Sequence, residues 1–319
     1  MPGREVPWLP VVRIGQIPLE EQRPRWLVQE LWGDSSVGVI GGAPKCSKTW
    51  LGLDLALSVA SGTACLGRYA VPQPGPVLVY LAEDALPTVR QRVAGMARHR
   101  GLELAAVEIH VITAPTLRLD REPQQKRLFE TARRLQPRLL LLDPLVRLHG
   151  LDENHAGEVA GLLAYFRSLQ RELQVSVILV HHTRKNTAAG VAAGQGLRGS
   201  SDIHAFGDSN LYLRRHKEQL LLSSEHRAAP AAPSVALRLV SSDAETTHLE
   251  VLAEGPDQQR VTRSLQDQVL DLLVPGVVLT RAKLRASLGV KNERLGEALE
   301  TLERAGRLNH TTTGWQRQS

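Results

Sequence analysis

Cysteine is scarce in this chain: Cys46 and Cys65 are the only two among 319 residues. Two cysteines provide neither a disulfide framework nor the paired spacing of a zinc site, so we expect a protein of the reducing cytoplasm. Long apolar runs are also missing. No segment approaches the roughly 18 residues that a membrane helix requires, and the first residues lack the core of a secretory signal. The sequence therefore predicts neither a membrane contact nor a disulfide-stabilised fold.

The charged residues are unbalanced, with 39 lysines and arginines against 33 aspartates and glutamates, a formal net charge of +6. A positive excess suits a polyanionic partner such as nucleic acid, although an arginine-rich composition is also typical of GC-rich genomes. Because 42% of the residues are hydrophobic, the chain can bury a large core. We expect a folded globular protein.

Apolar runs of strand length alternate with amphipathic segments of helix length over the first two thirds of the chain. Strands that are apolar on both faces and separated by helices indicate a parallel sheet covered on both sides. The predicted fold class is therefore α/β. The predicted strands cover residues 36–42, 77–84, 107–113, 137–143 and 175–182, and the predicted helices cover 49–62, 88–101, 122–135 and 156–173.

The pattern changes after residue 207. Short alternating runs between residues 207 and 252 predict antiparallel strands that extend the sheet. Residues 262–319 predict a helix, a short strand, two further helices and a hairpin, which is the order of a winged helix-turn-helix. The predicted organisation is a lead-in segment 1–36, an α/β domain 37–254, a linker 255–261 and a C-terminal domain 262–319.

A strand that runs into a glycine-rich turn and then a helix is the local structure of a phosphate-binding loop. From Gly42 to Thr49 the chain follows the pattern G-x-x-x-x-G-K-[ST] at every position but one. Lys48 would reach the β- and γ-phosphates of a nucleotide, and the Thr49 hydroxyl would bind Mg²⁺. The predicted nucleotide contacts are Gly42, Ala43, Pro44, Lys45, Cys46, Ser47, Lys48, Thr49 and Trp50.

Ser47 occupies the position of the second glycine in this pattern. The backbone curls tightly there, and a serine with positive φ costs roughly 1 kcal/mol or more. We expect a strained but usable loop, because nucleotide contacts can offset a cost of that size. The alternative is a glycine-rich turn before an ordinary helix.

Three predicted strands end in residues suited to nucleotide chemistry. Asp143 would hold Mg²⁺ directly or through water. Of the neighbours Glu83 and Asp84, Glu83 is the candidate that orients or deprotonates the attacking water, the alternative being a solvated acidic turn that caps the next helix. His181 and His182 point to opposite faces of their strand, so we expect one to sense the γ-phosphate and the other to be structural.

These motifs occur together between residues 25 and 215, as the segments GGAPKCSKTW, VLVYLAED, LLLLDPL, VILVHHTRK and LRGSSDI. In this combination the chain resembles the RepA-like ATPases of the RecA superfamily, which include ring-forming hexameric helicases of plasmid replication. The resemblance implies a RecA-type fold, ATP and Mg²⁺ as ligands, and a homo-oligomer such as a hexamer with nucleotide at the subunit interfaces. It also implies that Lys48 and Thr49 form Walker A, Glu83 is the catalytic base, Asp143 is the Walker B acid and His182 is the γ-phosphate sensor.

The chain departs from this family at Asp208. The family places an arginine a little after the RGSS-type segment, where it reaches into a neighbouring subunit's site as a finger. Asp208 stands at the matching position. Arg198, Arg214 and Arg215 are alternatives for this role, but the sequence assigns none of them as the finger, so fast, finger-assisted hydrolysis is not expected from it.

Two segments are candidates for DNA contact. In RecA-like proteins a loop at residues 183–201 lines the channel of the ring and holds single-stranded DNA; its candidates here are Arg184, Lys185 and Arg198. Since this loop has no aromatic residue, backbone contacts would dominate, and a plain loop that orders with nucleotide is the alternative. The C-terminal domain would contact duplex DNA through Lys291, Asn292 and Arg294 at the start of its longer helix and Arg317 on the wing, or it would serve as a protein-interaction module, which the glutamates of that helix favour.

The combined interpretation is an oligomeric RecA-type ATPase that acts on DNA in replication, recombination or mobile-element maintenance, with helicase activity among the candidates. The alternative is an ATP-switched DNA-binding regulator or adaptor that hydrolyses little or no ATP. Ser47 and the missing finger favour the regulator, whereas Glu83, Asp143 and His182 together favour an enzyme.

Overall fold

A computed structural model describes the chain over residues 11–17, 26–153, 156–182, 201–216, 218–252, 265–274, 276–290 and 292–318. None of the helices in these ranges combines the length and apolar character that crossing a bilayer requires.

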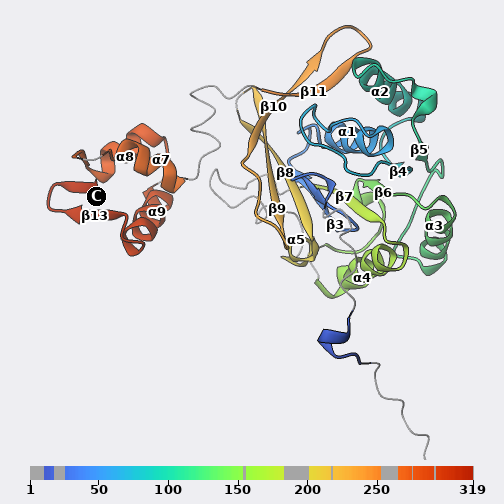
Figure 1. Cartoon of the computed structure of the whole chain (residues 1–319), viewed down its shortest axis with the longest axis horizontal. Coiled ribbons are helices and arrows are strands. Elements are labelled where there is room, and N and C mark those ends of the chain that lie inside the picture. Colours follow the sequence, from blue (N-terminus) through green and yellow to red (C-terminus); the bar gives the residue numbers. More distant parts are fainter. Residues whose placement is uncertain are drawn as a thin grey trace, which may run out of the picture.

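A nine-stranded sheet forms the centre of the molecule, in the order β11-β10-β9-β8-β3-β7-β6-β4-β5 (Figure 1). The strands from β8 to β5 in this order pair in parallel, and β9, β10 and β11 add an antiparallel extension. The predicted α/β fold class is confirmed. The strands are β3 (Val37–Gly42), β4 (Val77–Leu81), β5 (Ile109–Val111), β6 (Leu139–Asp143), β7 (Ser176–His182), β8 (Ser209–His216), β9 (Gln219–His226), β10 (Val235–Ser241) and β11 (Thr247–Val251).

Helices cover both faces of this sheet (Figure 1). Helices α1 (Lys48–Ser61) and α2 (Leu86–His99) lie on one face, and α3 (Glu122–Leu135), α4 (Ala156–Leu173) and α5 (Ser201–Phe206) lie on the other. Leu51 and Leu55 of α1 pack against one side of the strands, and Phe166 of α4 packs against the opposite side. Because strands such as β6 bury both faces, they read as continuous apolar runs in the sequence.

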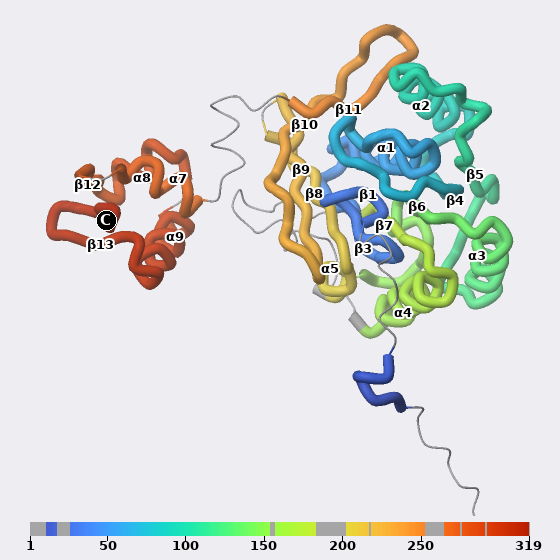
Figure 2. The backbone as a smooth tube through the Cα atoms, in the orientation of Figure 1, coloured from blue at the N-terminus to red at the C-terminus, as the bar shows by residue number. Residues whose placement is uncertain are grey.

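The predicted antiparallel extension is wrong for its first strand. Strand β8 runs parallel to β3, with Gly42 opposite Leu213, and antiparallel to β9. The chain enters β8 from helix α5 rather than through a hairpin, which permits the parallel pairing. Figure 2 shows the tube continuing from β8 through β9 and β10 to β11, which contacts α1 and α2.

Part of the predicted lead-in segment packs against the α/β domain. Strands β1 (Trp26–Val28) and β2 (Trp32–Gly33) form a small hairpin whose Leu27, Leu31 and Trp32 are buried in the same core as α1. Residues 26–33 are thus part of the packed α/β body. The described residues before the C-terminal elements also include short 3₁₀ helices at η1 (Ile14–Gln16), η2 (Leu104–Ala106) and η3 (Leu145–Arg147).

The C-terminal elements have a hydrophobic core of their own, which includes Val269, Leu284 and Leu299. They follow the predicted order of helix, strand, two helices and hairpin, and the Thr280 hydroxyl accepts a hydrogen bond from the Lys283 N–H as the N-cap of α8. Their assignment as a winged helix-turn-helix and the position of the domain boundaries stay predictions. The elements are α7 (Leu265–Leu272), β12 (Val278–Leu279), α8 (Arg281–Leu288), α9 (Asn292–Arg304), β13 (Leu308–Thr311) and β14 (Gly314–Arg317).

Candidate nucleotide-binding site

The turn between β3 and α1 contains two non-glycine residues in the left-handed region. Ser47, the N-cap of α1, has φ 60° and ψ 27°, and Lys45 has φ 63°. The positive φ expected for Ser47 is confirmed, at a cost of roughly 1 kcal/mol for such a residue. Gly42, where the turn begins, has no space for a side chain, since a Cβ there would lie 2.5 Å from the Leu213 carbonyl oxygen.

The ammonium group of Lys48 lies under this turn. Its Nζ donates to the carbonyl oxygens of Gly42 at 3.0 Å and Ala43 at 2.9 Å, and it lies 3.2 Å from Nδ1 of His182. The residue is only 5% exposed. Burial lowers the pKa of Lys48 from its ordinary value, and the neighbouring Asp143 partly offsets this effect. A buried cation at a helix N-terminus is suited to hold an anion.

Thr49 and Asp143 meet at the carboxyl end of β6. The Thr49 hydroxyl donates to Oδ2 of Asp143 over 2.7 Å. Burial raises the pKa of Asp143 to about 6, against the opposing influence of the Thr49 hydrogen bond and the Lys48 charge. Two hard oxygen donors at this spacing, next to a phosphate-binding turn, form the donor set that Mg²⁺ prefers.

The acids that follow β4 have different partners. Oε1 of Glu83 lies 2.8 Å from Nε of Arg147, with side-chain exposures of 49% and 63%. Asp84 pairs with Arg92 at 2.6 Å, and the Arg92 guanidinium lies over the Trp50 ring, 5.3 Å from its centroid. Asp84 is therefore held by a more enclosed contact than Glu83, so the Glu83 carboxylate is the more available of the two.

The paired histidines of β7 contact different groups. His182 lies beside Lys48, as described above, and belongs to the cleft. His181 is 1% exposed, and its Nδ1 lies 3.8 Å from Oε1 of Glu153, which is 3.4 Å from Nε2 of the buried His149. His182 therefore lines the cleft and His181 lies inside the fold, while the γ-phosphate sensor role expected of one of them stays a prediction.

A cleft of about 340 Å³ connects these groups, and its lining fits a magnesium-bound nucleoside triphosphate. It offers a buried cation, a helix N-terminus, a hydroxyl paired with a carboxylate, and a more exposed second acid. All of its lining residues except Leu81 and Arg92 were identified from the sequence. The lining residues are Lys45, Cys46, Ser47, Lys48, Thr49, Trp50, Leu81, Glu83, Asp84, Arg92, Asp143 and His182.

A family model described as AAA domain matches residues 4–188, more than half of the chain. The chain belongs to the AAA domain family. The matched range contains the phosphate-binding turn and every residue that lines the cleft. This AAA domain protein is therefore, in general terms, a P-loop ATPase.

Two solved structures are similar to this AAA domain protein at low identity. The RadB recombinase has a TM-score of 0.48 and 16% identity over 69% of this chain and 92% of its own. A DnaB-like replicative helicase, solved in a study of its interactions with primase, has a TM-score of 0.52 and 14% identity over 67% of this chain and 59% of its own. The likeness to the helicase shows a shared RecA-like fold.

The predicted DNA contacts are divided between described and undescribed parts of the AAA domain protein. Arg184, Lys185, Arg198 and Lys291 lie outside the described residues. Asn292 and Arg294 begin α9, away from the cleft in sequence, and Arg317 is exposed on β14. The three described candidates, Asn292, Arg294 and Arg317, are not among the residues that line the cleft.

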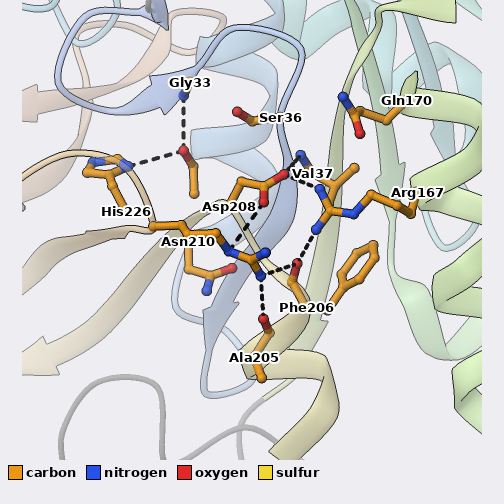
Figure 3. Close-up of polar contacts among 12 residues, drawn as sticks. Gly33, Ser36, Val37, Arg167, Gln170, Ala205, Phe206, Asp208, Asn210 and His226 are labelled. Atoms are coloured by element: carbon orange, nitrogen blue, oxygen red, sulfur yellow. Dashed lines mark hydrogen bonds and ion pairs between the residues drawn. The ribbon is translucent and has the colours of Figure 1, made fainter. Parts of the chain in front are cut away.

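Asp208, at the position of the missing finger, lies in a polar network (Figure 3). Its carboxylate forms ion pairs with Arg167 of α4 and Arg227 and accepts a hydrogen bond from the Val37 N–H at 3.2 Å. Arg167 also donates to the Phe206 carbonyl at 2.6 Å. Asp208 thus links the start of β3 to α4 through Arg167 and to Arg227, which follows β9, and its role is structural.

The sequence did not identify Arg92 and Arg147 as members of this region, and it named Arg215 only as an alternative for the arginine finger. Arg147 follows Asp143 by four residues in η3, so its closeness in sequence to Asp143 was an available signal. Arg92 lies about two turns into α2, which begins at Leu86, so its contact with Asp84 before the helix had no helical spacing to signal it. No local sequence pattern placed Arg215 beside the phosphate-binding turn of its own chain, because only the parallel pairing of β8 with β3 brings it there.

Proposed function

We propose that this AAA domain protein binds ATP with Mg²⁺ in the cleft, hydrolyses it, and acts as an oligomer on DNA in replication, recombination or mobile-element maintenance. One observation carries the nucleotide part of this proposal. The buried Lys48 ammonium, the Thr49–Asp143 pair and the exposed Glu83 carboxylate, which come from three separate strand ends, line one cleft beside a helix N-terminus.

Lys48 and the turn that precedes it would hold the β- and γ-phosphates. The lysine already lies against the Gly42 and Ala43 carbonyls, so its ammonium needs little movement to reach an anion in the turn. Thr49 and Asp143 would hold Mg²⁺, which supplies charge neutralisation for the transferred phosphoryl group when bound.

Glu83 would accept the proton of the attacking water. A base must be free to approach water, and an ion pair between half-exposed side chains contributes only about 0.2–1 kcal/mol, so the Arg147 contact is easily broken. Asp84 is the weaker candidate, because it would have to leave an arginine that is itself held over Trp50. This difference supports Glu83 as the base.

His182 would report the state of the γ-phosphate. Its contact with Lys48 ties it to the group that binds the phosphate, and it ends the strand that leads into residues 183–200. A change at the phosphate would thereby act on the segment in which we place the contacts with single-stranded DNA, through Arg184, Lys185 and Arg198.

The DNA part of the proposal rests on the positive net charge, on those basic residues, and on the fold shared with a DnaB-like replicative helicase. Duplex contact through Asn292, Arg294 and Arg317 belongs to the same proposal. In its most specific version, the proposal is that the protein forms a hexameric ring and separates DNA strands.

A regulator that binds ATP but turns it over slowly is the second candidate. Two observations favour it: Ser47 adopts the strained left-handed conformation, and Asp208, which the resemblance to RepA-like ATPases aligns with their arginine finger, is engaged in a structural network. Without a charge that arrives at the γ-phosphate, a P-loop ATPase loses a large part of its acceleration.

Measurements on the purified full-length chain separate these candidates. Calorimetry with ATP and Mg²⁺ tests binding, a phosphate-release assay with and without single-stranded DNA tests turnover, and mass determination with and without ATP tests assembly. Turnover that DNA stimulates in an oligomer supports the ATPase proposal, whereas tight binding with negligible turnover supports the regulator. A folded chain that takes up no ATP at millimolar concentration contradicts both.

A further inference from the structure

Strand β8 extends beyond the end of its partner β3. The parallel register places Gly42, the last residue of β3, opposite Leu213, so that Arg214, Arg215 and His216 continue alongside the phosphate-binding turn. The approach is close, since a Cβ on Gly42 would lie 2.5 Å from the Leu213 carbonyl oxygen. The side chains of the β8 residues that follow Leu213 therefore begin next to the phosphate-binding turn.

Arg215 contacts the turn directly. Its Nη2 donates to the carbonyl oxygen of Lys45 over 3.1 Å. Lys45 is one of the two left-handed non-glycine residues of the turn, and Ser47 is the other. The guanidinium of Arg215 therefore binds the backbone at a strained residue, two positions before the serine that replaces glycine.

The orientation of one peptide group follows from this contact. The C=O and N–H of a trans peptide point in opposite directions, so a Lys45 carbonyl that faces Arg215 turns the N–H of Cys46 away from β8. Cys46 belongs to the lining of the cleft. N–H groups of such a turn are the donors that surround a phosphate, and they bind best when they are fixed before the ligand arrives.

We propose that Arg215 is a positioning residue for the phosphate-binding turn of its own chain. By holding the Lys45 carbonyl it fixes the Lys45–Cys46 peptide in a turn that lacks the second glycine, and it offsets part of the strain at Ser47. This inference rests on the proposed ATP binding. It assigns Arg215 to nucleotide affinity in cis, which differs from the role of an arginine finger that acts on a neighbour's γ-phosphate.

The test measures nucleotide affinity and turnover in three variants of the full-length chain. In Arg215→Ala we expect the Kd values for both Mg-ATP and Mg-ADP to rise about five-fold and KM for ATP to rise with them, while kcat stays within two-fold of the parent. Arg215→Lys keeps one donor and should recover part of the affinity. Arg214→Ala is the matched control, since it removes the same side chain from the adjacent position on the opposite face of β8 and should keep the parental Kd values.

A double-mutant cycle with Ser47→Gly tests the compensation itself. Glycine adopts positive φ without strain, so Arg215→Ala should raise Kd less than two-fold in the Ser47→Gly background. Thermal melting of each variant confirms that it is folded.

The outcomes separate this inference from the proposed function. If the parent chain binds no ATP, the proposed function fails. If the parent binds ATP and Arg215→Ala has the same Kd values as Arg214→Ala, only the role of Arg215 is refuted. A loss of kcat above 100-fold with unchanged Kd would also refute it, because Arg215 would then act on the reacting phosphate. Equal effects of Arg215→Ala in the parental and Ser47→Gly backgrounds would refute the compensation.

Discussion

The two ends of the β3–β8 strand pair differ in how their polar groups are satisfied. At the end where both strands begin, Asp208 is balanced by Arg167 and Arg227 and accepts the Val37 N–H. At the other end, two residues adopt positive φ, the pKa of buried Lys48 is lowered and the pKa of buried Asp143 is raised. The first end is a closed network, and the second holds strain and poorly solvated charges.

This contrast indicates where the molecule is shaped for a ligand. A network whose donors and acceptors already match gains nothing from a further ion. Charged groups whose pKa values are shifted by burial gain from any ligand that neutralises them, which is why such groups concentrate at functional sites. The predictions below either remove a charge from the strained end or disturb the closed network.

Removal of Lys48 should have the largest effect. In Lys48→Ala we expect turnover to fall about 10³-fold, because the turn loses its only buried cation among the described residues of the cleft. A phosphate-release assay measures it, and Lys126→Ala serves as the control because it removes an exposed lysine of α3 that does not line the cleft. Equal turnover in the parent and in Lys48→Ala would refute the site.

Replacement of Glu83 should separate binding from turnover. Glu83→Gln keeps the shape of the side chain but cannot accept a proton, so we expect turnover to fall about 10²-fold with the Kd for Mg-ATP within two-fold of the parent. Asp84→Asn is the comparison. A larger loss of turnover in Asp84→Asn than in Glu83→Gln would show that Asp84, and not Glu83, is the base.

Reversal of the charge at Asp208 should break the closed network. Asp208→Arg would place a third guanidinium beside Arg167 and Arg227, so we expect the free energy of unfolding to fall by about 3 kcal/mol. Asp208→Asn keeps the shape and should lose about 1 kcal/mol. Urea unfolding measures both. Faster hydrolysis by a stable Asp208→Arg chain would instead show that an arginine at this position can act as a finger.

Removal of the charge on Asp143 should stabilise the nucleotide-free protein. The folded pKa of about 6 exceeds the ordinary value of 3.8, so the folded state holds the proton more tightly and stability falls as pH rises from about 4 to 6. Asp143→Asn should therefore gain about 1–3 kcal/mol above pH 6 and nothing near pH 4, while it loses Mg-dependent turnover. Melting curves across this pH range measure the gain, and a loss of stability at pH 7 would contradict the argument.

The Arg147–Glu83 ion pair should have the smallest effect. Since both side chains are about half exposed, Arg147→Gln should raise turnover by no more than about five-fold, by releasing the base. A steep fall in turnover would show that Arg147 itself takes part in the reaction.

Much of the candidate site was predictable because its residues lie at the ends of recognisable segments. The apolar run before Asp143, the turn before Lys48 and the run before Glu83 each place a polar side chain at the carboxyl end of a strand, and parallel strands bring these ends to one edge. The positive φ of Ser47 followed from the same reasoning, since the turn has one geometry whichever residue occupies it.

Other features depended on contacts that no local pattern encodes. The burial of Trp32, the parallel pairing of β8 and the ion pairs of Asp208 join residues far apart in the chain. The sequence by itself determined the phosphate-binding turn, the strand ends and the α/β alternation, because backbone geometry and side-chain periodicity are local properties. Only the tertiary structure decided which arginine meets Asp208 and which meets the turn, because a charged side chain takes its partner from the strand or helix that packs beside it.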